Sequence, residues 1–178
     1  MELTYQHIPT LRKASGIDFP SSLPAIKAPI TIPANTTVTL LLDQTYLTNA
    51  YLTLNFSKGK DAGISLKYAE SLFENLKKYG ARKGNRNEVE GKDFSGRKDS
   101  LISDGGNGHV YTTLNYRTYR YFQLLVHTKN EPLIIEDIYG TFNGYPFKQN
   151  AVFNTDNTEI KNMLGIGWRT ARMDATET

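Results

Sequence analysis

One run of residues constrains the fold of this chain more than any other feature. Residues 119–126 read Tyr-Arg-Tyr-Phe-Gln-Leu-Leu-Val, a stretch of aromatic and aliphatic side chains with little polar interruption. In an extended strand successive side chains point to opposite faces, so both faces of this strand are largely apolar. Such a strand needs an apolar layer on each side, and we therefore expect it inside a layered β-structure.

Shorter strand signals occur along much of the chain. Ile64, Leu66 and Tyr68 alternate with polar or small residues, which is the period-2 pattern of a half-buried strand. Other β-rich runs are separated by turn-forming clusters such as Asp104–Gly108. These other runs cover residues 37–42, 51–56, 110–114 and 133–142. Short strands, frequent turns and almost no helical period predict a mainly β chain folded as an antiparallel sandwich, with a jelly roll as the first choice of topology.

The N-terminal segment differs from the rest of the chain in its proline content. Residues 1–33 hold five of the seven prolines of the chain. Proline at this density is incompatible with helix or a central strand. We therefore expect an extended lead-in over residues 1–33 and the sandwich proper over residues 34–153.

The C-terminal segment, residues 154–178, is predicted to be helical. Asp156 and Glu159 have the spacing of an N-cap and its capping-box partner. Apolar side chains then recur at roughly helical spacing, at Ile160, Met163, Leu164, Trp168 and Ala171. A stripe of this kind on a helix too short to form a core requires a partner, either the sandwich or a further domain.

Composition and charge exclude several function classes. The chain has no cysteine, which excludes a disulfide framework, a thiolate zinc site and a cysteine nucleophile. The net charge of +3 comes from residues 74–99, where eight basic side chains face five acidic ones with few aromatics, so we expect no nucleic-acid partner. No signal peptide and no long apolar stretch is present, so we expect no membrane partner. Without a nucleotide-binding or hydrolase-elbow motif, we expect no cofactor and no metal.

The acidic residues offer one catalytic hypothesis, which we reject at this stage. Glu88 and Glu90 would lie on one face of an extended segment, about 7 Å apart, as in an inverting glycosidase. Basic residues surround them in the sequence. Ion pairing favours the charged carboxylate, which suits a general base but not a general acid. We therefore expect a salt-bridged loop and no catalytic residue.

Two further structural expectations concern the long segment of residues 71–100. It is rich in Gly, Asn and charge, and we expect an ordered excursion anchored by Val89 and Phe94. Just before it, Glu70 follows a predicted strand. We expect Glu70 to be partly buried and to form a structural ion pair with Arg120.

Four segments together resemble the bacterial α-L-rhamnosidases of glycoside hydrolase family 78. They are residues 66–70, 83–92, 116–122 and 167–172, and the similarity runs from about residue 31 to residue 178. The resemblance implies a concanavalin-like sandwich that precedes an (α/α)6 barrel, and in that family the barrel carries the carboxylates that hydrolyse rhamnosides with inversion. No catalytic residue of the family falls on a position of this sequence. We therefore expect a fragment that is inactive by itself and belongs to a parent glycoside hydrolase.

The resemblance also implies partners and a set of interface residues. The expected partner is the missing catalytic barrel, and the exposed helix would allow self-association. The residues expected to face the barrel are Asn85, Arg86, Asn87, Glu88, Trp168 and Arg172. The family resemblance implies a periplasmic or extracellular location.

An alternative from another class remains open. The sandwich would then be a carbohydrate-binding module that holds plant-type glycans itself. Its binding groups would include exposed aromatics and the side chains of Asn85, Asn87 and Asp104, with or without calcium.

Overall fold

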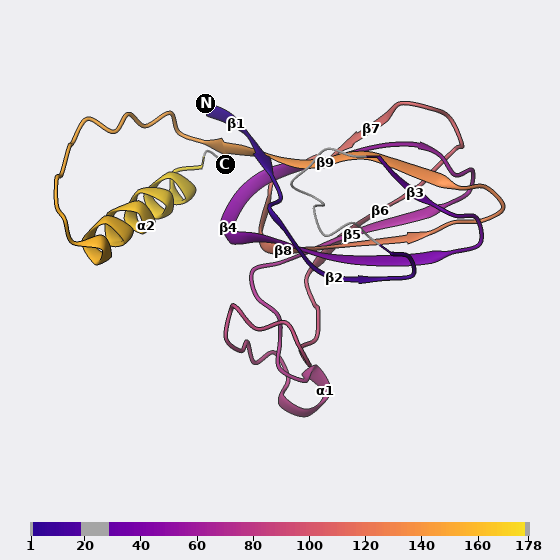
Figure 1. The fold of residues 1–178 in the computed structure, drawn as a ribbon, viewed down its shortest axis with the longest axis horizontal. Helices are drawn as coiled ribbons and strands as arrows, with labels where there is room; N and C mark the ends of the chain where they lie inside the picture. Colours follow the sequence, from indigo (N-terminus) through magenta and orange to yellow (C-terminus); the bar gives the residue numbers. More distant parts are fainter. Residues whose placement is uncertain (1, 19–28, 177–178) are drawn as a thin grey trace.

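A computed structural model describes residues 2–18 and 29–176, and these residues form an antiparallel β-sandwich with a C-terminal helix (Figure 1). The predicted fold class is therefore confirmed. The strands are β1 (Glu2–His7), β2 (Thr10–Ser15), β3 (Ile30–Ile32), β4 (Thr37–Lys58), β5 (Gly63–Ala69), β6 (Arg97–Ile102), β7 (His109–Thr112), β8 (Arg117–His127) and β9 (Leu133–Gly144). The helices are α1 (Leu76–Tyr79) and α2 (Thr158–Asp174). Neither described helix is long and apolar enough to cross a membrane.

The long strand β4 belongs to both layers of the sandwich. Its first part pairs with β2 and β8, and its second part, from Ala50, pairs with β9 and β7. The pairing with β8 shifts register between Asp43 and Thr48, and Thr45 in this interval has a positive φ of 70°. The sequence predicts two strands here, over residues 37–42 and 51–56, whereas the structure has one strand with a corner in the middle.

The main core lies between the two layers. Alternate residues of β4 (Val38, Leu40, Leu42, then Leu52, Leu54, Phe56) are buried, and Ile64, Leu66, Phe122, Leu124 and Val126 meet them from β5 and β8. Each such side chain contributes about 1.5–3 kcal/mol when it is fully buried. The opposite face of β8 is also covered, because Tyr121 packs in a second cluster with side chains of the segment that follows β5. The predicted covering of both faces is therefore confirmed at Tyr121 but not along the whole strand, because Gln123 and Leu125 are only partly buried.

The N-terminal segment is part of the sandwich. β1 pairs antiparallel with β9, β2 pairs with the first part of β4, and β3 pairs with β9. The segment is extended as predicted, but a boundary at residue 34 is wrong, because extended edge strands can join a sheet between prolines. Pro9 lies between β1 and β2, and Pro29 and Pro33 flank β3. The predicted lead-in also includes residues 19–28, with Pro20 and Pro24, which lie outside the described residues.

Helix α2 begins one residue later than its predicted cap implies. The N-cap is Asn157, whose Oδ1 accepts hydrogen bonds from the backbone N–H groups of Glu159 (2.9 Å) and Ile160 (3.4 Å). Asp156 is therefore not the cap, because asparagine in the next position supplies the same acceptor. A connector of residues 145–157 carries the chain away from the sandwich, and α2 leads it back (Figure 1).

Candidate functional site

The segment between β5 and β6, residues 70–96, is an ordered excursion that contains α1 (Figure 1). Val89 is buried in the cluster with Leu72 and Tyr121, and Phe94 packs against the same cluster. The Tyr121 hydroxyl also donates a hydrogen bond to the carbonyl oxygen of Arg86. The predicted anchoring by Val89 and Phe94 is confirmed.

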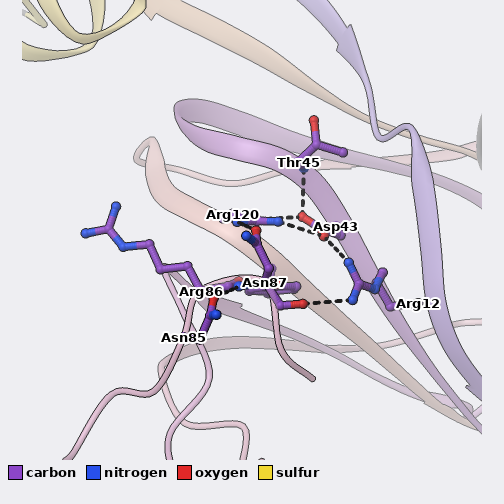
Figure 2. Close-up of polar contacts among 8 residues, drawn as sticks. Arg12, Asp43, Thr45, Asn85, Arg86, Asn87 and Arg120 are labelled. Atoms are coloured by element: carbon purple, nitrogen blue, oxygen red, sulfur yellow. Dashed lines mark hydrogen bonds and ion pairs between the residues drawn. The ribbon is translucent and has the colours of Figure 1, made fainter. Parts of the chain in front are cut away.

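A buried carboxylate at the corner of β4 fixes this excursion to the sandwich (Figure 2). Asp43 is 1% exposed and accepts from Arg12 Nη1 at 3.0 Å and from Arg120 Nε at 2.9 Å. Its Oδ1 also accepts the backbone N–H of Thr45 at 2.7 Å, which holds the corner. Both arginines continue to Asn87 of the excursion: Arg120 Nη1 donates to Asn87 Oδ1 at 2.8 Å, and Arg12 Nη2 donates to its carbonyl at 3.0 Å. One network therefore joins three strands and the loop.

The electrostatics of this network set the charge state of Arg120. Burial acts to lower the pKa of Arg120, but the hydrogen bond to Asp43 and the charge of Asp43 outweigh it, so the pKa lies above its ordinary value. Arg120 thus remains a cation with a fixed orientation.

The predicted ion pair between Glu70 and Arg120 is wrong. Arg120 pairs with Asp43, and Glu70 pairs with Lys83, with 2.8 Å between Lys83 Nζ and Glu70 Oε2. β5 ends at Ala69, and the Glu70 side chain is about half exposed rather than partly buried.

A hollow of about 230 Å³ lies between the excursion, the corner of β4 and α2. Its walls come from Tyr46, Leu47, Glu70, Arg86, Arg120, Ile166, Arg169 and Thr170. A smaller hollow of about 100 Å³ shares Tyr46, Leu47 and Arg169 and extends toward Phe142 and Arg172. The helix thus bridges the corner of β4 without close packing beneath it.

Helix α2 is attached to the sandwich through its C-terminal half. Asn49 Nδ2 donates to the carbonyl oxygen of Met173 at 2.8 Å. The Arg169 guanidinium lies 5.5 Å from the centre of the Tyr46 ring, and Arg172 lies 4.8 Å from the centre of the Phe142 ring. None of the residues of α2 is buried.

The N-terminal half of α2 presents apolar side chains to solvent. The exposed fractions are 36% for Ile160, 63% for Met163, 48% for Leu164 and 55% for Ile166. We call Ile160, Met163 and Leu164 the apolar face of α2, because Ile166 instead lines the hollow together with Arg169 and Thr170. The sandwich does not cover this face.

The structure places the six predicted interface residues in different surroundings, four on the excursion and two on α2. Asn85 and Asn87 hold the loop, since Asn85 Oδ1 accepts the N–H of Asn87, while the Arg86 side chain extends away from the network and lines the hollow (Figure 2). Glu88 lies outside the hollow and pairs with Lys92 at 3.3 Å. On α2, Trp168 lies 6.3 Å, ring centre to ring centre, from Phe147 of the connector. Arg172 lines the smaller hollow.

Other observations bear on the competing hypotheses. Glu90 pairs with Lys13, and both Glu88 and Glu90 are exposed in salt bridges. Asp104 belongs to a separate turn and lies 2.8 Å from His109 Nε2, so its contacts are not those of Asn85 and Asn87. Among the described residues, no three His, Asp or Glu side chains are grouped as metal ligands.

The sequence reasoning missed four residues of this region: Arg12, Asp43, Tyr46 and Arg169. Asp43 lies 31 residues from Arg12 and 77 residues from Arg120 in the sequence, so no local pattern links them. Tyr46 follows a break in the apolar pattern of β4, and Arg169 lies on the polar side of the predicted helical stripe.

Comparisons with known proteins show the fold of the chain. The sequence matches no known family model and no curated protein. The structure is similar to that of the GH78 family rhamnosidase of Bacillus sp. GL1, with a TM-score of 0.66 and 19% identity over 88% of this chain and 15% of that enzyme. It is also similar to a rhamnosidase from Klebsiella oxytoca with rhamnose bound, with a TM-score of 0.68 and 14% identity over 98% of this chain and 36% of that enzyme. The chain therefore spans well under half the length of either enzyme and shares a rhamnosidase-like fold.

Proposed function

We propose that this chain is an accessory, interface-forming β-sandwich domain of a glycoside hydrolase resembling α-L-rhamnosidase. The reaction of the parent enzyme would be the inverting hydrolysis of terminal α-L-rhamnosides. A separate helical domain would carry out the catalysis. The chain itself would contribute an interface and no catalytic group.

The exposed apolar face of α2 carries the proposal. A helix in a protein gains most of its stability by packing an apolar face against a neighbour. Here Met163 and Leu164 are about half exposed or more, while the sandwich holds the C-terminal end of the helix. A contiguous apolar surface of this kind is typical of a contact with another domain.

The polar surroundings of this face support the same conclusion. Arg86 of the excursion and Arg169 of α2 lie on opposite sides of the hollow beside the apolar face. An apolar centre with a rim that includes arginine is the usual composition of a protein interface. The two rhamnosidases of similar fold are much longer than this chain, which supports a further domain of the same polypeptide as the partner.

A binding measurement tests the proposal. The polypeptide encoded after Thr178 would be produced separately and titrated with this chain. We expect association, and we expect Met163→Glu to weaken it about tenfold or more, ~1.4 kcal/mol, because a charge replaces an apolar contact. Val110→Glu is the matched control, since Val110 is 67% exposed on β7, outside the apolar face.

Two results would contradict the proposal. One is a gene that ends directly after Thr178. The other is equal binding by the two glutamate variants. Turnover of an aryl α-L-rhamnoside by this chain alone would show that it carries the catalytic groups, and would also overturn the assignment.

A further inference from the structure

We infer that the hollow between α2 and the excursion binds the carboxylate of an acidic sugar, a hexuronate unit of an oligosaccharide. The inference does not rest on the proposed function. It rests on the charges, the hydrogen-bonding groups and the size of the hollow itself.

The first observation is an excess of positive charge. The hollow and the network behind it contain five cations and two carboxylates. They are Arg12, Lys83, Arg86, Arg120 and Arg169, against Asp43 and Glu70. Asp43 forms ion pairs with Arg12 and Arg120, and Glu70 forms an ion pair with Lys83. Within the part of the chain that the structure describes, no carboxylate lies within ion-pair distance of Arg86 or Arg169.

The second observation is the kind of cation. A guanidinium group donates two parallel hydrogen bonds and matches the two oxygens of a carboxylate. Arg86 and Arg169 approach the hollow from the excursion and from α2 respectively. Arg120 also lines the hollow, but its guanidinium already donates to Asp43 and Asn87, so Arg86 and Arg169 supply the donors for a ligand. The hollow therefore presents donors for an anionic group with oxygen atoms.

The third observation distinguishes a sugar acid from a protein side chain. Glu70 also lines the hollow, and its carboxylate, which is paired with Lys83, can accept hydrogen bonds from hydroxyl groups. A sugar acid carries such hydroxyl groups next to its carboxylate, whereas an aspartate or glutamate side chain does not. The Thr170 hydroxyl donates to the Ile166 carbonyl at 3.0 Å, which leaves its oxygen able to accept from a sugar. Leu47 and Ile166 provide apolar surface for the C–H groups of a ring.

The size of the hollow agrees with one sugar ring. Its volume of about 230 Å³ is below the ~300 Å³ at which sites for drug-sized molecules begin. The hollow is also continuous with solvent on the side of Glu70, Arg86 and Arg169, all of which are exposed, so the rest of an oligosaccharide can extend outward.

Calorimetric titration tests the inference. The probes are an α-1,4-linked galacturonic acid trisaccharide and the neutral galactose trisaccharide with the same linkage. We expect the acidic sugar to bind, with an affinity that falls as salt is added, and the neutral sugar to bind at least about tenfold more weakly. Trp168, the only tryptophan of the chain, lies on α2 and gives a second, fluorescent readout.

Single variants locate the site. Arg86→Ala and Arg169→Ala should each weaken binding of the acidic sugar about tenfold or more. Lys129→Ala is the control, because it removes one positive charge from the exposed turn between β8 and β9. Denaturation curves of all three variants verify that they remain folded.

Several results would overturn the inference. They are equal binding of the acidic and neutral sugars, no binding of the acidic sugar, and unchanged binding by both arginine variants. Inorganic sulfate that displaces the acidic sugar at equal concentration would show a general anion site and would also overturn the sugar assignment. Met163 does not line the hollow, so Met163→Glu should leave acidic-sugar binding unchanged while it weakens the association with an adjoining domain, and the two proposals can fail separately.

Discussion

Replacement of Asp43 by asparagine is the sharpest test of how the site is held. The Asp43 carboxylate is 1% exposed and is the shared ion-pair partner of Arg12 and Arg120. The amide of the substituted side chain would keep an oxygen that can accept the N–H of Thr45, so Asp43→Asn removes the charge but preserves the hydrogen bond at the corner. The loss of stability should therefore measure the ionic part of the network.

The magnitude follows from burial. Removal of one partner of a buried ion pair typically costs about 3–5 kcal/mol, because a charge is left without compensation. The Arg12 side chain is 29% exposed and Arg120 is 12% exposed, so water reaches part of the released charge. We therefore expect the low end, ~3 kcal/mol, which corresponds to a fall in Tm of about 6–12 °C for a chain of this size.

The assay is urea denaturation at neutral pH, with Glu70→Gln as the control. The Glu70–Lys83 pair is about half exposed, and its loss should cost less than ~1 kcal/mol. Asp43→Ala should cost about 1 kcal/mol more than Asp43→Asn, because it also removes the acceptor for Thr45. A loss for Asp43→Asn as small as that for Glu70→Gln would show that the ionic network contributes little to stability.

Three other substitutions test the corner and the core. Thr45→Asn should raise the free energy of unfolding by about 1 kcal/mol in urea, because a β-branched residue at φ 70° is strained and asparagine tolerates this conformation; a loss of stability would contradict the strain. Gly140→Ala should lower the free energy of unfolding by about 1–3 kcal/mol, because the new Cβ would lie 2.7 Å from the Tyr119 hydroxyl. This cost should be smaller in a Tyr119→Phe background, and an equal cost in both backgrounds would contradict the contact. Burial raises the pKa of the Tyr119 phenol. The unfolded phenol ionises near pH 10, so its contribution to stability is complete below pH 10 and is lost as the pH rises toward the folded pKa. Tyr119→Phe should therefore weaken the decline in stability above about pH 10, and an unchanged decline there would count against it.

The strands were predictable where the pattern is local. The alternation over Ile64–Tyr68 and the two apolar faces of residues 119–126 indicate β5 and β8 without further information. The corner of β4 was not predictable, because its buried polar residues depend on distant partners. Thr48 donates to Gln6, and Asn49 accepts from Thr118. Polar residues that interrupt the apolar pattern in the sequence therefore have hydrogen-bond partners inside the fold.

The candidate site was predictable only in part. The resemblance to rhamnosidases indicates the loop of residues 83–92 and the helix, and the structure brings Arg86 and α2 to the same hollow. The ion-pair partner of Arg120 was mispredicted because Glu70 follows a strand in the sequence, whereas the chain turns outward there and Asp43 occupies the buried position. Arg169 gave no signal, because an isolated arginine on a helix normally faces solvent.

The central claim is that α2 docks against a further domain through its apolar face. Amide hydrogen exchange of residues 160–166 tests it most directly, measured in this chain alone and in the presence of the polypeptide encoded after Thr178. We expect fast exchange in the isolated chain and slowing of about a hundredfold or more, ~2.7 kcal/mol, with the partner. Equal exchange rates in both samples would contradict it.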